Sequence, residues 1–115
     1  LHHRNPGVIT AALLDDSVFT EIIGDGHHVD YDLIRLILKI KTVQKSILVS
    51  DCMALAGLPE GADMQFGNQR VVHHAGGRVI NESGSLAGSA YLLQQSVQKL
   101  LQQKKNDFVL VLEFD

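Results

Sequence analysis

A carboxylate stands at the end of the most strand-like run in the chain. The apolar residues 47–49 lead through Ser50 into Asp51, and a stretch of small residues closed by Gly57 and Pro59 follows. A short continuous apolar run is typical of a strand that is buried on both faces. Catalytic groups of α/β proteins gather at the carboxyl ends of such strands. Asp51 is therefore a candidate acid or base, and the simpler alternative is that it caps the next turn or helix.

A second group of ionisable residues follows another strand-like run at 18–23. A Gly-Asp-Gly turn comes first, and His27 and His28 come next. Neighbouring residues of an extended chain point to opposite faces, so one of the two imidazoles is expected to be the working residue. The alternative is a histidine held by a backbone carbonyl. A residual metal site made of His27, His28 and Asp51 is disfavoured, because metal selectivity needs more fixed ligands.

Residues 31–41 have the clearest helical pattern. Asp30 is expected to cap the start of this helix. Its apolar residues recur at helical spacing and predict one buried stripe, widened by two further residues: Leu33, Leu36, Ile37 and Ile40, with Ile34 and Leu38. The order strand, helix, strand over 18–23, 31–41 and 46–51 predicts a βαβ unit with two parallel strands and a right-handed crossover.

The chain changes character between residues 64 and 81, where short strand-like pieces alternate with turns. Gly76-Gly77 separates two such pieces, 70–74 and 78–81. A Gly-Gly dipeptide in this position predicts a β-hairpin.

A second amphipathic helix is expected near the C-terminal end. Residues 86–89 (LAGS) are expected to open it. Its apolar stripe is predicted to pack in the core and consists of Leu93, Val97, Leu100 and Leu101. The last apolar run, Phe108–Phe114, has the composition of a strand, and its open edge would favour pairing with another chain.

The bulk composition excludes several classes of protein. The length of 115 residues predicts one domain. A net charge of −3 gives no indication of nucleic-acid binding. No apolar stretch approaches the roughly 18 residues of a membrane span. The single cysteine, Cys52, excludes an internal disulfide and suits a reducing, cytoplasmic compartment. The chain has neither an initiating Met nor a visible secretory signal, and we expect it to be processed, trimmed or part of a longer protein.

Four stretches in order along the chain point to a known family. They are Arg4-Asn5-Pro6-Gly7, Asp25-Gly26-His27-His28-Val29, Leu48-Val49-Ser50-Asp51 with Ala56-Gly57 after it, and Gly84-Ser85-Leu86-Ala87-Gly88-Ser89. Each stretch is weak evidence alone, but their order and spacing match together. From Leu1 to about Leu101 the chain resembles the N-acetylglucosamine-6-phosphate deacetylase family of the amidohydrolase superfamily, whose members are metal-dependent hydrolases.

The resemblance implies an α/β fold that is part of a TIM (β/α)8 barrel of the metal-dependent hydrolase type. Residues 1–115 would be part of that catalytic domain, because a full barrel takes about 250 residues. The runs at 18–23 and 46–51 match the seventh and eighth strands. Residues 62–85 would be a β-hairpin excursion, and residues 102–115 depart from the family pattern as an atypical tail.

The resemblance also implies a reaction, the deacetylation of N-acetylglucosamine 6-phosphate to glucosamine 6-phosphate and acetate. Asp51 matches the family's catalytic acid/base, and His28 matches a histidine that contacts the substrate. Arg4 matches an arginine that reaches the phosphate in a neighbouring subunit, which implies a homodimer or higher homo-oligomer. The implied substrate-binding residues are Arg4, Asp25, Gly26, His27, His28, Leu86, Ala87 and Gly88.

A divalent metal ion of the zinc or iron type is implied for the complete enzyme. The family's metal ligands, a glutamate and two histidines, come from strands that precede Leu1. Within this chain only Asp51 is a possible metal contact. We therefore expect the metal to be absent from this chain and the isolated chain to be inactive.

A second hypothesis comes from a different functional class. The chain would be a non-catalytic α/β module that self-associates or binds a sugar phosphate. This hypothesis accounts for the missing metal ligands and for the atypical tail.

Overall fold

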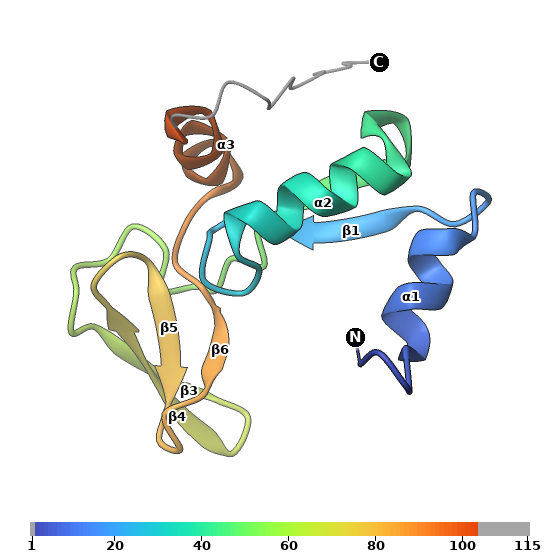
Figure 1. Ribbon diagram of the computed structural model, residues 1–115. Coiled ribbons are helices and arrows are strands. Elements are labelled where there is room, and N and C mark those ends of the chain that lie inside the picture. Colours follow the sequence, from blue (N-terminus) through green and yellow to red (C-terminus); the bar gives the residue numbers. More distant parts are fainter. Residues whose placement is uncertain (1, 104–115) are drawn as a thin grey trace.

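The computed structural model describes residues 2–103 of the chain as a mixed α/β structure (Figure 1). The predicted strand at 108–114 lies outside the described residues. The elements in chain order are α1 (Gly7–Leu14), β1 (Thr20–Ile23), α2 (Tyr31–Lys41), the short 3-10 helix η1 (Val43–Lys45), β2 (Ser46–Val49), β3 (Asp63–Phe66), β4 (Gln69–His74), β5 (Arg78–Asn81), β6 (Leu86–Ser89) and α3 (Leu93–Gln102).

The predicted strand–helix–strand unit is present. β1 and β2 pair in parallel, in a register that runs from Thr20 opposite Ser46 to Ile23 opposite Val49. α2 connects the two strands and lies alongside β1 in Figure 1. The Asp30 side chain accepts a hydrogen bond from the backbone N–H of Asp32 at 2.8 Å, so Asp30 caps the helix as predicted.

The buried face of α2 differs from the predicted stripe. Three predicted core residues, Leu33, Leu36 and Ile40, are 39%, 47% and 44% exposed. The face that packs inward is rotated and carries Ile34, Ile37 and Lys41. It meets α1, β1 and α3 in a core cluster of Leu13, Ile22, Ile34, Ile37 and Leu100. Ile34 and Ile37 were among the predicted apolar residues, and Lys41 was the member of this face that the spacing missed.

Lys41 fits this face through the two chemical parts of its side chain. An apolar stem can cover core surface while the charged end reaches a polar group. Lys41 Nζ donates a hydrogen bond to the backbone carbonyl of Asp15, just after α1. The side chain therefore joins the end of α2 to the end of α1.

A second sheet holds the other half of the chain. β3, β4, β5 and β6 form an antiparallel sheet in that order. The hairpin predicted around Gly76-Gly77 is confirmed, with His74 opposite Arg78. This sheet has its own core cluster of Leu55, Val71, Val79 and Ala90. In Figure 1 it lies below α3 and the end of β1, well away from α1.

The residues 86–89 form a strand, not the start of a helix. They pair with β5, with Leu86 opposite Ile80 and Ser89 opposite Arg78, so a partner distant in sequence decides their conformation. α3 begins only at Leu93. Its predicted stripe is also partly wrong, because Leu93 and Leu101 are 43% and 57% exposed while Ser96 and Leu100 are buried.

Across residues 2–103, no helix is both long enough and apolar enough to cross a bilayer.

The observed burial of α2 leads to a stability prediction. Ile34 is 1% exposed and Leu36 is 47% exposed on the same helix. Ile34→Ala should lower the free energy of unfolding by about 2–5 kcal/mol, because it leaves a cavity in the core. Leu36→Ala should cost about 1 kcal/mol or less. Urea unfolding of the 115-residue chain measures both, and a larger loss for Leu36→Ala would contradict the observed helix orientation.

Candidate active site

Asp51 lies two residues after Val49, the last residue of β2. Its backbone has a φ of 48°, in the left-handed region that aspartate adopts more readily than most residues. Such backbone conformations cluster at functional sites when the surrounding structure holds them in place. Here the backbone N–H of Ser89 donates to the Asp51 carbonyl at 2.9 Å, and Met53 N–H donates to the Ser89 carbonyl at 2.8 Å. The last residue of β6 therefore fixes the segment that carries Asp51.

Gly88 makes this close approach of β6 possible. A Cβ atom at residue 88 would lie 2.7 Å from Met53 Cγ and 3.3 Å from the Asp51 carbonyl oxygen, and the φ of Gly88 is 152°. Of the three residues expected to line the substrate pocket, Gly88 is thus beside Asp51. Ala87 is partly buried, and Leu86 is 38% exposed at the far end of the strand.

The loop after β1 turns around the buried carboxylate of Asp25. One oxygen, Oδ1, accepts hydrogen bonds from the backbone N–H groups of His27 at 2.9 Å and His28 at 3.0 Å. The other oxygen, Oδ2, accepts a hydrogen bond from Nδ1 of the His28 ring at 2.9 Å. Burial raises the pKa of Asp25, but these hydrogen bonds from His28 and His27 outweigh it, so the pKa lies below its usual value. Asp25 is therefore a buried anion.

Gly26 and Tyr31 hold this loop against the start of α2. Gly26 has a φ of 77°, and a Cβ atom there would lie 2.4 Å from the Tyr31 ring. The Tyr31 hydroxyl donates to the Asp25 carbonyl at 3.3 Å. Gly26 thus gives the loop its tight path, and the structure places it against Tyr31.

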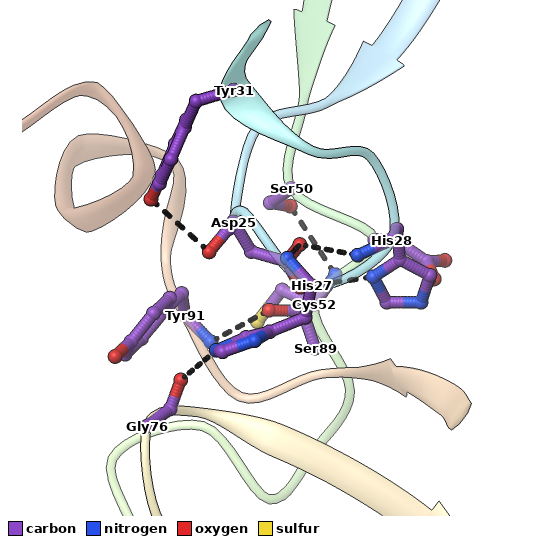
Figure 2. A network of polar contacts seen from close by, with 10 residues as sticks. Asp25, His27, His28, Tyr31, Ser50, Cys52, Gly76, Ser89 and Tyr91 are labelled. Carbon is purple, nitrogen blue, oxygen red and sulfur yellow. Dashed lines mark hydrogen bonds and ion pairs between the residues drawn. The ribbon is translucent and has the colours of Figure 1, made fainter. Parts of the chain in front are cut away.

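His27 and His28 leave this loop in different directions (Figure 2). His27 Nε2 donates to the Gly76 carbonyl at 2.8 Å, in the hairpin turn between β4 and β5. His28 Nε2 lies 3.7 Å from Asp51 Oδ2. The two imidazoles have separate partners as predicted, although they sit in a turn and not in an extended strand. His27 matches the alternative of a histidine held by a carbonyl, and His28 faces the candidate acid/base.

Arg4 belongs to a different part of the chain from the His28–Asp51 pair. It lies in the exposed turn that precedes α1, where its backbone N–H donates to His2 Nδ1 at 3.3 Å. Figure 1 shows this N-terminal segment beside α1. Among the predicted site residues, the structure therefore brings together Asp25, His28, Asp51 and Gly88 and places Arg4 elsewhere.

Two residues that support the site were not predicted. Ser89 is fully buried and bonds to the Asp51 segment through its backbone, while its hydroxyl accepts from Tyr91 N–H at 3.1 Å. Gly76 anchors His27 from 49 positions away in sequence. The Gly76-Gly77 dipeptide predicts the turn, but no local signal reveals the histidine that docks on it.

The described residues do not fit a metal centre of their own. Between residues 2 and 103, no group of three or more His, Cys, Asp or Glu side chains is arranged to hold a metal ion. Asp51 and His28 face each other, and His27 is turned toward Gly76. Two facing side chains are fewer than the three protein ligands of a typical catalytic zinc site.

Proteins similar to this chain in sequence and structure are deacetylases of amino-sugar phosphates. No family model matches the chain. A putative N-acetylgalactosamine-6-phosphate deacetylase from Escherichia coli K12 is 35% identical over 102 residues, which are 89% of this chain and 59% of that protein. The crystal structure of N-acetylglucosamine-6-phosphate deacetylase from Thermotoga maritima matches with a TM-score of 0.80 at 34% identity, over 89% of this chain and 28% of that one. The chain is homologous to the amino-sugar 6-phosphate deacetylases.

The homology confirms the family resemblance seen in the sequence. The match nevertheless covers only part of each relative. A variant deacetylase from Mycobacterium smegmatis, solved in complex with N-acetyl-D-glucosamine 6-phosphate, matches with a TM-score of 0.76 at 27% identity. The alignment covers 83% of this chain and 25% of that one. The present chain thus spans 59% of the Escherichia coli relative and about a quarter of the two deacetylases of known structure.

The buried Asp25 carboxylate predicts a pH dependence of stability. Its pKa is below the usual 3.8 in the folded protein, so ionised Asp25 stabilises the fold above the unfolded-state pKa of about 3.9. That stabilisation is lost as the pH falls through the lower folded-state value. Asp25→Asn should therefore reduce the free energy of unfolding at neutral pH, and the difference from wild type should shrink below about pH 4. Urea unfolding between neutral pH and pH 2 measures it, and a difference that stays constant over this range would contradict the assignment.

Proposed function

We propose that this chain supplies the C-terminal part of the active site of an amino-sugar 6-phosphate deacetylase. The substrate would be N-acetylglucosamine 6-phosphate, and the products glucosamine 6-phosphate and acetate. One observation carries the proposal: His28 and Asp51 face each other after two parallel strands, in a chain homologous to these deacetylases. The Mycobacterium smegmatis relative holds this sugar phosphate in its crystal structure, which supports the choice of substrate.

We propose further that β1 and β2 are the seventh and eighth strands of a (β/α)8 barrel. Their parallel pairing through a helix is the repeating unit of that fold, and its active sites lie at the carboxyl ends of the strands. Parallel sheets are normally covered on both faces and flanked by further strands. The exposure of Ile47 on β2 and of Val8 and Leu14 on α1, at 43%, 82% and 75%, suits a chain that packs against more of a barrel.

Asp51 would transfer the protons of the reaction. Hydrolysis requires a water molecule to lose a proton as its oxygen adds to the acetamide carbonyl carbon, and the departing nitrogen must then gain a proton. A single carboxylate can accept the first proton and deliver it to the amine as the C–N bond breaks. The Asp51 side chain is 49% exposed, so water and substrate can reach it.

His28 would contact the substrate beside Asp51. Its Nε2 is the ring nitrogen that points toward the carboxylate, and the His28 side chain is 18% exposed. A ring nitrogen in that position can hydrogen-bond a polar group of a bound sugar phosphate. β6 would form the adjoining wall of the pocket through Leu86, Ala87 and Gly88.

The remaining parts of the site would come from residues outside 2–103 or from a second copy of the protein. A divalent metal ion, if the complete enzyme uses one as its resemblance to the family implies, would be held mainly by residues outside this chain. Arg4 would reach the phosphate of a substrate bound to a neighbouring subunit. A planar guanidinium suits this contact, because it can hold a phosphate through two hydrogen bonds.

The first test is removal of the Asp51 charge in the complete protein that contains this chain. Asp51→Asn should lower kcat for release of acetate from N-acetylglucosamine 6-phosphate by about 10²–10⁴-fold. Asparagine also tolerates the left-handed backbone at this position, so the fold should be kept. Asp16→Asn is the matched control, because Asp16 is an exposed aspartate in the turn after α1.

The same experiment separates the two hypotheses for the chain. Equal activity of the Asp51→Asn and Asp16→Asn proteins would contradict the role of Asp51. Binding of the sugar phosphate without acetate release by the complete wild-type protein would support the non-catalytic module. The isolated 115-residue chain should release no acetate.

The second test concerns Arg4 and the phosphate. Arg4→Ala should raise KM for N-acetylglucosamine 6-phosphate by about tenfold or more, because a hydrogen bond to a charged group contributes about 1.5–3 kcal/mol. It should have little effect on whatever activity is measured with unphosphorylated N-acetylglucosamine, because that sugar has no phosphate for Arg4 to hold. Steady-state kinetics with both sugars measure this difference, and an equal loss with both would exclude a phosphate contact.

A further inference from the structure

The Asp25 side chain is closed off from any ligand. It is 0% exposed. Its Oδ1 accepts from two backbone N–H groups, of His27 and His28, and its Oδ2 accepts from the His28 ring. A carboxylate surrounded in this way cannot also hold a substrate. Asp25 can therefore influence the exposed part of the site only through the His28 imidazole.

The contact with Asp25 determines which ring nitrogen of His28 carries a hydrogen. An ionised carboxylate can only accept hydrogen bonds, so the short contact between Oδ2 and Nδ1, at 2.9 Å, requires the hydrogen on Nδ1. A neutral ring then has an unprotonated Nε2. That nitrogen is the one that lies 3.7 Å from Asp51 Oδ2.

The loop holds Asp25 firmly enough to direct the ring. The two backbone N–H donors are His27 and His28 themselves, so the carboxylate cannot rotate without losing them. The Tyr31 hydroxyl binds the Asp25 carbonyl, and His27 is anchored on Gly76 of the hairpin. The ring is therefore oriented by a rigid partner, as are ligating and catalytic histidines that donate their second N–H to a carboxylate.

We propose that Asp25 is a positioning residue that fixes His28 with its hydrogen on Nδ1 and its Nε2 directed at Asp51. This role replaces the direct substrate contact that the sequence resemblance implies for Asp25. The effect of Asp25 on turnover rests on the function proposed above. The effect on the ring itself does not, because it follows from the contacts of the folded chain.

The test measures directly which ring nitrogen of His28 carries the hydrogen. Long-range ¹H–¹⁵N spectra of the complete protein, labelled with ¹⁵N-histidine, assign the hydrogen to Nδ1 or Nε2 when the ring is neutral. Wild type should show His28 with the hydrogen on Nδ1. Asp25→Asn should shift His28 toward the Nε2–H form, because the amide can donate as well as accept and no longer imposes one form.

Asp30→Asn is the matched control for the same spectra. Asp30 caps α2 only two residues after His28, and asparagine is an equally good cap. This variant should leave the His28 signals as in wild type. If Asp25→Asn fails to fold, the wild-type spectrum alone still tests the proposal, because a His28 ring with its hydrogen on Nε2 in wild type would overturn it.

Kinetics of the same variants separate this proposal from the proposed function. Asp25→Asn should lower kcat for deacetylation by about 10–100-fold, as loss of an orienting partner does at other histidine sites, while Asp30→Asn stays at the wild-type rate. An Nδ1–H ring that responds to Asp25→Asn in a protein without deacetylase activity would support the positioning role and contradict the function. A His28 ring with the same hydrogen position in wild type and Asp25→Asn would overturn the positioning role, whatever the activity.

Discussion

The buried Asp25 carboxylate needs hydrogen-bond donors on every side, because an unpaired charge in a protein interior costs several kcal/mol. The loop after β1 supplies them from its own backbone at His27 and His28 and from the His28 ring. To do so the chain must turn sharply at Gly26, and it enters α2 directly afterwards with Asp30 as the cap. The end of β1, the start of α2 and the direction of His28 thus all depend on one anion.

The site also depends on the junction between two separately packed halves. One core joins α1, α2, α3 and β1, and the other lies against the β3–β6 sheet. The chain crosses from the first half to the second near Asp51, two residues after the end of β2. Ser89 of β6 binds the backbone on both sides of Cys52. On the other side of the site, His27 reaches the hairpin at Gly76. Each histidine therefore connects the loop to a different element, and the second sheet holds both the His27 ring, at Gly76, and the Asp51 segment, at Ser89.

Local sequence was enough to predict the parts of the fold that depend on local physics. The βαβ unit, the Asp30 cap and the Gly76-Gly77 hairpin follow from periodicity, cap chemistry and turn chemistry, and the structure contains all three. The pairing of His28 with Asp51 was not predicted as a contact. Their placement after two strands of a parallel unit nevertheless marked both as candidates.

The errors arise where distant partners decide the outcome. α2 is apolar on two faces, and only packing against Leu13 and Ile22 selects the face with Ile34 and Ile37. Residues 86–89 have small side chains with little preference of their own, so pairing with β5 makes them a strand. Lys41 was not predicted to be buried, because lysine counts as a charged residue in a hydrophobic pattern although its apolar stem can pack in the core.

The same reasoning explains why Asp25 and His28 play different parts although both were predicted as substrate contacts. Sequence alone places them three residues apart in a polar loop, and any of its side chains could face a ligand. Burial separates them, since the Asp25 side chain is 0% exposed and the His28 side chain 18%. The aspartate is held inside by its own backbone, and the histidine lies between it and Asp51 with one nitrogen for each. A buried anion that orients a partly exposed base is a general way to fix a reactive geometry. Here the anion and the base lie within residues 25–28, and contacts from Ser89 and Gly76 hold the two segments that meet at Asp51.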